Sequence, residues 1–133
     1  MAVDMGSGIS KTFTADGDLS AKQYHFVKQS TAGKVAICSG ATDRPIGVLQ
    51  NDPTDGQEAV VMIMGVSKVS ANEALTLDWL IGTSADGQAD RKIAGTDVTE
   101  FICGTVLSAT TAAAGLATCA INCATPTLSV TGN

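Results

Sequence analysis

Residues that could carry catalysis are few in this chain: one histidine, His25, and four cysteines. A hydrolase needs a nucleophile, a base within hydrogen-bond reach and a third group that orients the base. His25 lies between Tyr24 and Phe26, in a stretch whose aromatic and β-branched residues are typical of a strand. No Gly-x-Ser-x-Gly motif occurs in the sequence. We therefore interpret His25 as a structural residue and keep a Cys–His pair only as an alternative that nothing local favours.

The four cysteines could in principle form disulfides or hold zinc. Cys119 and Cys123 are four positions apart, which on a strand corresponds to about 13 Å, beyond the ~7 Å Cα separation that a disulfide allows. On a helix the two residues would be neighbours. Neither arrangement resembles a zinc pair, and a single histidine makes a structural zinc site a poor fit. Cys38, Cys103, Cys119 and Cys123 are accordingly expected to be buried, inert thiols.

Asp52, Asp55 and Glu58 lie close together in the sequence and could suggest paired catalytic carboxylates or a calcium loop. The segment lacks the alternating ligands and the terminal glutamate of an EF-hand, and aspartate is favoured in turns because it bonds to nearby backbone. The sequence also contains neither a Gly-x4-Gly-Lys phosphate loop nor a dinucleotide-binding glycine pattern. We therefore expect no catalytic site, no metal and no cofactor, and predict that the chain is not an enzyme.

The composition bounds the kind of partner that the chain can have. Charged residues make up 16% of the 133 residues, against about 25% in an average domain, and Ala, Gly, Thr and Ser take their place. The eight Lys and Arg are scattered and the net charge is −5, so no basic stripe is present for nucleic acid. No apolar run approaches the ~20 residues of a membrane helix, and no signal-peptide pattern is present. We expect synthesis in the cytoplasm and contacts with other protein.

Turn dipeptides such as Asp16-Gly17, Asp55-Gly56 and Asp86-Gly87 separate short apolar stretches, which is the pattern of an all-β sandwich or barrel. The run at 57–64 is apolar on both faces and is therefore predicted to be a central strand covered on both sides. The predicted strands are 24–28, 34–38, 46–49, 57–64, 101–107 and 116–122.

The segment from Ser70 to Gly82 is ambiguous. Ser70 and Glu73 have the spacing of a capping box, which favours the start of a helix. Apolar residues alternate with other residues from Leu75 to Ile81, which favours a strand. We interpret the segment as a strand, preceded at most by one helical turn.

The two ends differ from the middle of the chain because they contain little to bury. We expect an N-terminal arm over residues 1–12, one β-barrel domain over 13–123 and a C-terminal tail over 124–133. Arms that order only against a partner and simple frayed ends are both compatible with this composition.

The order of the short segments along the chain is similar to that of a known protein family. A Tyr-His-Phe-Val strand precedes a series of short glycine-marked strands, and the series extends from about Gln23 to Cys123. Its members are Tyr24–Val27, Gly33–Ile37, Ile46–Leu49, Asp55–Val61, Gly65-Val66, Asp86-Gly87, Gly104–Leu107 and Gly115–Ala117. The series resembles the small capsid decoration, or cement, proteins of tailed phages. Each piece is short, so the resemblance depends on order and spacing.

This resemblance implies an all-β fold: a small β-barrel or β-tulip-like domain with extended N- and C-terminal arms. It implies a capsid decoration protein that binds the outer surface of the mature head as a homotrimer at three-fold and quasi-three-fold positions. The partner would be the major capsid protein, and the role would be to stabilise the shell against DNA pressure. A terminal arm would add a strand to a coat-protein sheet. Ile9, Lys11 and Phe13 are the candidate capsid-contact residues, with Phe13 as the foremost apolar anchor.

An alternative function is a head-fibre base or a carbohydrate-binding β-module. Sugar-binding surfaces commonly use exposed aromatic platforms, and only five aromatic rings occur in the sequence. Most of these five rings fall in predicted strands, which weighs against sugar binding.

Overall fold

The computed structural model describes residues 8–128, and the regular elements in this range are all β-strands. None of the described residues forms a helix long and apolar enough to cross a membrane. The first five strands are β1 (Ile9–Ala15), β2 (Phe26–Thr31), β3 (Lys34–Ile37), β4 (Gly47–Leu49) and β5 (Glu58–Ser70). They are followed by β6 (Leu80–Thr83), β7 (Ala89–Arg91), β8 (Phe101–Ile102), β9 (Gly104–Ser108), β10 (Leu116–Asn122) and β11 (Thr127–Leu128).

The first five strands form a closed barrel. They are hydrogen-bonded in the order β1-β3-β2-β4-β5, and β1 also pairs with β5, which closes the ring. The barrel is mixed, because β1 and β3 run parallel while the other neighbours run antiparallel. The sequence-based prediction of an all-β barrel is thereby confirmed.

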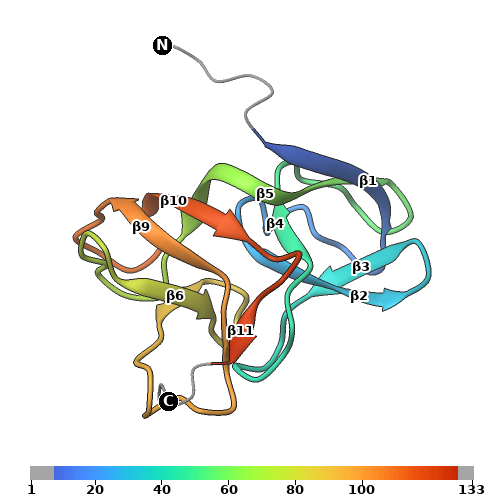
Figure 1. Ribbon diagram of the computed structural model, residues 1–133. Helices are drawn as coiled ribbons and strands as arrows, with labels where there is room; N and C mark the ends of the chain where they lie inside the picture. Colours follow the sequence, from blue (N-terminus) through green and yellow to red (C-terminus); the bar gives the residue numbers. More distant parts are fainter. Residues whose placement is uncertain (1–7, 129–133) are drawn as a thin grey trace.

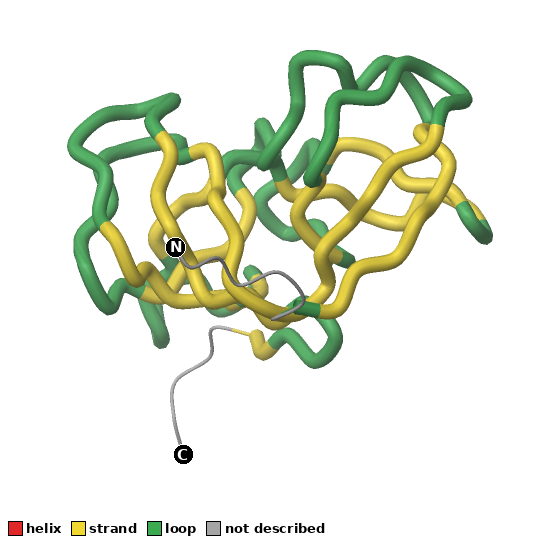
Figure 2. Tube along the Cα trace, turned by 90° about the horizontal axis from the view of Figure 1, so that it is seen from above, coloured by secondary structure: helices red, strands yellow, loops and turns green. Residues whose placement is uncertain are grey.

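The remaining strands extend from the barrel through β5. This strand is long enough to pair with β1 and β4 over its first half and with β10 from Met64 to Ser70. The sheet then continues in the order β10-β9-β6-β7, and a short separate pair joins β8 and β11. Figure 1 shows β9, β10 and β6 beside the barrel, and the view from above shows the strands in two groups (Figure 2).

Two hydrophobic cores follow from the alternation of side chains along the strands. Val27 and Leu49 point into the barrel, where they pack with buried residues of β1, β3 and β5. Their neighbours Phe26 and Val48 lie in the second core, between the barrel and the β6–β10 sheet. Because successive side chains of a strand point to opposite faces, β2 and β4 serve both cores and hold the two groups of strands together.

Most predicted strands are present, with shifted ends. The predictions at 34–38 and 116–122 correspond to β3 and β10, whereas β5 continues six residues beyond the predicted end at Met64. The prediction that 57–64 is central is confirmed, because β5 pairs with three strands. Its outward side is only partly covered, since Val60 and Met62 are half-buried and Met64 is exposed.

The prediction of one strand over Ser70–Gly82 was wrong. Leu75 forms only an isolated bridge with Thr110, and Asp78 has a φ of 69°, which interrupts any extended strand. The strand β6 begins at Leu80. Of the alternating apolar residues, Leu75 and Ile81 are buried and Trp79 packs against the same core, whereas Leu77 is exposed. The alternation therefore reflected burial without a continuous strand.

The ends of the described chain also belong to strands. Residues 9–12, assigned above to an N-terminal arm, form the first part of β1 and pair with β5. Thr127 and Leu128, assigned to the C-terminal tail, pair with Ile102 and Phe101 of β8. The rest of the predicted arms, residues 1–7 and 129–133, lies outside the described residues.

Candidate interaction surface

The polar residues considered for chemistry do not assemble into a reactive site. His25 is half-buried, and its Nδ1 lies 3.1 Å from the backbone oxygen of Gln23. Burial lowers the pKa of His25 below its usual value. No group of three or more His, Cys, Asp or Glu side chains within residues 8–128 is arranged to hold a metal ion.

The four cysteines are free and buried. Burial raises the pKa of Cys38 and of Cys119 to about 12. The pKa of Cys123 is also raised, first by a hydrogen bond with Cys103 and then by burial. Because the thiolate is the nucleophilic form, these shifts make the thiols unreactive at neutral pH. Their placement in the second core agrees with the expectation of buried thiols.

The carboxylates of the 51–58 turn line an open hollow, formed by Asn51, Asp52, Pro53, Gly56, Gln57 and Glu58. Asp55 Oδ1 accepts a hydrogen bond of 2.8 Å from the backbone N–H of Gly17, which ties this turn to the loop after β1. Asn51 bonds to the backbone of Glu58 and Val60 across the turn. Asp55 and Asn51 therefore serve to hold the backbone of the turn in place, as expected for polar residues in turns.

The aromatic rings offer no sugar-binding platform among the described residues. Phe13 and Phe26 are buried, and Tyr24 and Phe101 pack against the second core. Trp79 also packs against that core, and the guanidinium of Arg91 lies 4.2 Å from its ring centroid. None of the five aromatic residues is exposed, so none presents an open ring face of the kind that stacks on a sugar.

A weakly charged surface covers the outer side of the second sheet. The strand register places Val66 of β5, Ala120 of β10, Thr105 of β9 and Leu80 of β6 in one row across four strands. Val66 is 45% exposed and Leu80 is 39% exposed. Large apolar side chains are rarely gathered on an exposed sheet without a partner, so this row is the candidate contact surface.

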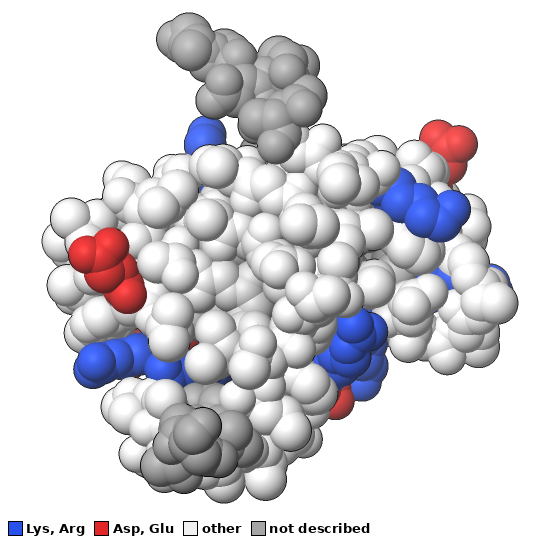
Figure 3. Space-filling model, in the orientation of Figure 1, with Lys and Arg blue, Asp and Glu red and all other residues white. Residues whose placement is uncertain are grey.

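Neighbouring residues of the same strands extend this row. We call the outer face the exposed and half-buried residues on β5 from Met64 onward and on β10, β9 and β6 whose side chains share this side of the sheet. They are Met64, Val66, Lys68, Leu80, Thr105, Ser108, Leu116, Thr118, Ala120 and Asn122. Lys68 is the one charged residue of this set. Figure 3 shows the area over β9 and β10 as white, with charged atoms toward the margins.

The composition of the outer face is that of a protein-contact surface. The centres of such interfaces are depleted in charge, because burying an unpaired charge is costly. The chain carries a net charge of −5, yet this face holds only Lys68. No signal in the sequence points directly to this face, since Thr118 and Ala120 alternate with buried residues as in any half-buried strand.

The three predicted contact residues of β1 are in different environments. Ile9 is 60% exposed and lies opposite Met64, at the end of the outer face. Lys11 is exposed, and its Nζ lies 5.4 Å from the ring centroid of Phe13. Phe13 is only 6% exposed and belongs to the barrel core. Capsid contact by Ile9, Lys11 and Phe13 stays a prediction, and the burial of Phe13 makes it a weaker candidate for the apolar anchor than Ile9.

Comparison with known proteins finds solved structures with a similar arrangement of strands. The chain is similar to the head fiber gp8.5 N base of bacteriophage phi29, with a TM-score of 0.63. The two share a fold. The similarity covers 86% of this chain and 94% of the gp8.5 base, at 17% sequence identity. No protein-family model matches the sequence, and no curated protein matches it.

Proposed function

We propose that the chain is a structural, non-enzymatic protein of a phage head, located on the outer surface of the virion. The observation that carries this proposal is the fold similarity to the gp8.5 base, which covers 94% of that base. The proposed role is that of a base module, which attaches a head appendage to the major capsid protein. Similarity to a head-fibre base supports this role better than that of a cement protein that covers the whole lattice.

We further propose that the outer face is the side that docks on the capsid. A sheet face with one charge can be buried against another protein without leaving several charges unpaired. A homotrimer would present this face to three coat subunits at once, so three modest contacts would add through avidity. Ile9, at the end of this face, would extend the contact along β1.

The test is binding of the purified chain to phage heads that lack it, measured by co-sedimentation. We expect the wild-type chain to sediment with the heads, and we expect V66E to lower the affinity by about tenfold or more, because the new carboxylate would be buried. V98E is the matched control, since Val98 is 42% exposed and lies outside the outer face. Failure of the wild-type chain to bind would overturn the head location, and unchanged binding of V66E would move the contact to another face.

A cement role, with homotrimers at three-fold and quasi-three-fold positions, is the competing form of a head protein. It predicts a copy number comparable to that of the coat protein and a higher melting temperature of decorated heads, because binding to the mature shell alone stabilises it. A base module alone predicts attached protein without a gain in head stability. Light scattering of the free chain would test the homotrimer separately.

A further inference from the structure

Lys92 is a buried charged residue that has no part in the proposed function. It follows β7 directly, and its backbone N–H donates a 2.8 Å hydrogen bond to Leu80 O. Its side chain is 0% exposed. A Cβ added at Gly82 would lie 3.0 Å from Lys92 Cε and 2.1 Å from the backbone oxygen of Phe101. Because Gly82 has no side chain, the aliphatic part of Lys92 can pack directly against the backbone at position 82.

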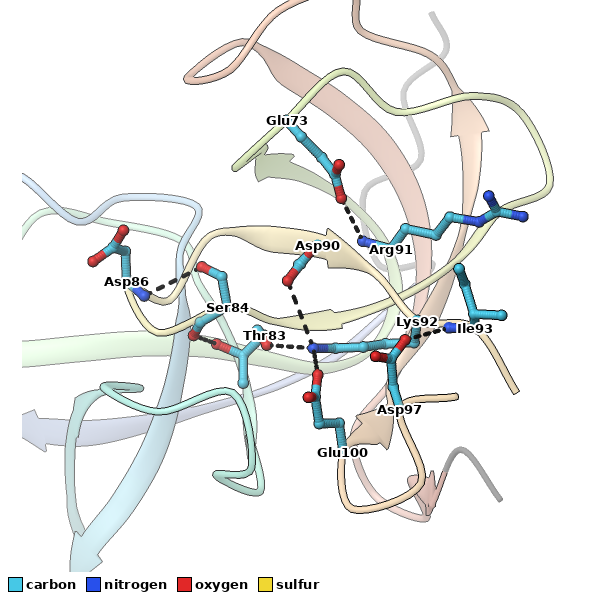
Figure 4. A network of polar contacts seen from close by, with 10 residues as sticks. All are labelled: Glu73, Thr83, Ser84, Asp86, Asp90, Arg91, Lys92, Ile93, Asp97 and Glu100. Carbon is cyan, nitrogen blue, oxygen red and sulfur yellow. Dashed lines mark hydrogen bonds and ion pairs between the residues drawn. The ribbon is translucent and has the colours of Figure 1, made fainter. Parts of the chain in front are cut away.

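The amine of Lys92 ends among three oxygen acceptors. Nζ donates a hydrogen bond of 2.9 Å to the backbone oxygen of Thr83 and contacts the carboxylate of Glu100 directly. Oδ2 of Asp90 lies 3.8 Å from the same nitrogen. In Figure 4 the side chains of Asp90 and Glu100 converge on Nζ from different segments of the chain.

The carboxyl group of Glu73 lies next to that of Asp90. Burial, and next to it the neighbouring carboxyl group of Glu73, raise the pKa of Asp90 to about 6. Glu73 Oε2 also accepts a 3.1 Å hydrogen bond from the backbone N–H of Arg91. Two facing carboxyl groups can share a proton, so the pair can both accept a proton and return one.

We propose that Lys92 and Glu100 join through an intramolecular isopeptide bond. Asp90 first takes a proton from the Lys92 ammonium, which frees the Nζ lone pair to attack Cδ of Glu100. The new N–C bond forms, the nitrogen gives up a second proton, and one C–O bond of the carboxyl group breaks. Both protons pass through Asp90 to the departing oxygen, which leaves as water. Ammonium and carboxylate thus give one amide and one water, without an oxidant or a cofactor.

Physical chemistry favours this product at this place. Taking both partners of an ion pair out of water is costly, and an amide removes both charges. A fixed amine beside a fixed carboxyl group reacts with a large proximity advantage, because the two groups have no freedom left to lose. Glu100 retains 22% side-chain exposure, which leaves the released water a way out. The bond would fix the 93–99 loop between β7 and β8.

The mass of the unfolded, full-length chain tests the proposal. We expect it to be lighter than the sequence mass by one water. Lys92 is the last tryptic site of the chain, and trypsin does not cleave after an amidated lysine. The C-terminal tryptic peptide is therefore expected to begin at Lys92 and to carry the same loss, with fragment ions locating the link at Glu100. The full sequence mass, together with a peptide beginning at Ile93, would overturn the proposal and leave an ion pair.

Two variants refine the test. K92R should restore the full mass, whereas K28R, which alters the Lys28–Asp43 ion pair (2.9 Å), should keep the loss of water. D90N should leave a mixture of linked and unlinked chains, because the proton relay is impaired while both reacting groups remain. A link located at Asp90 instead of Glu100 would overturn the assignment of the acceptor. None of these readouts depends on the head location.

Discussion

Gly8 and Gly65 meet back to back where β1 reaches the middle of β5. A Cβ built on Gly65 would lie 2.6 Å from Cα of Gly8, and a Cβ on Gly8 would lie 2.8 Å from the backbone oxygen of Met64. Gly65 has a φ of 137°. It stands where β5 leaves its pairing with β1 and continues with β10, so this contact joins the barrel to the second sheet.

Replacing Gly65 by alanine should lower the free energy of unfolding by about 2 kcal/mol or more, because the methyl group adds a backbone clash to an unfavourable φ. Gly56→Ala is the matched control, since Gly56 has a φ of 82° and nothing within 4 Å of its added Cβ. Its cost should be near 1 kcal/mol, from backbone conformation alone. Urea denaturation of the two variants measures the difference, and equal costs would show that the Gly8 contact is unimportant.

Phe13 and Ile9 should respond differently to truncation, although both lie on β1. Phe13→Ala removes a ring from the barrel core and should cost about 3 kcal/mol or more of unfolding free energy. Ile9→Ala should change stability by about 0.5 kcal/mol or less, because Ile9 is 60% exposed. Thermal or urea unfolding tests both values. A small cost for Phe13→Ala would contradict its role in the core.

The strands differ in how well they could be predicted from the sequence, and β1, which holds Ile9 and Phe13, is one that could not. Strands with regular alternation, such as β3 and β10, were predicted because each presents buried residues at every second position. β1 was missed, since only Phe13 and Ala15 of its residues are buried and its outward residues resemble a polar arm. The outer face could not be predicted, because its row depends on the register of four strands far apart in the chain.

The cysteines should remain unmodified in the folded protein. A thiol reagent at neutral pH should label none of the four quickly in the native state and all four in denaturant, because the thiols are buried and their pKa values are raised for Cys38, Cys119 and Cys123. The denatured sample serves as the control for accessibility. Rapid labelling of one thiol in the native state would indicate that the second core opens locally.

Asp90 should make the folded protein less stable as the pH rises. Its pKa is raised from 3.8 to about 6 by burial and by the neighbouring carboxyl group of Glu73, despite the opposing charge of Lys92. Between these two pH values the folded state binds a proton that the unfolded state has lost, so the unfolding free energy decreases from about pH 4 to about pH 6. An isopeptide bond at Lys92 would keep this direction, since it removes the cation that favours the charged form.

The variant Asp90→Asn removes this titration, and it is compared with wild type in the same linkage state, which the mass establishes. Asparagine has no proton to lose, so the variant should gain of the order of 1 to 2 kcal/mol relative to wild type between pH 4 and pH 6. His25 contributes in the opposite direction, because its lowered pKa makes the folded protein lose stability as the pH falls below about 6.5. Its contribution is common to both proteins and cancels in the difference. Urea denaturation of both across this range measures the difference, and a value independent of pH would show that Asp90 titrates normally in the folded state.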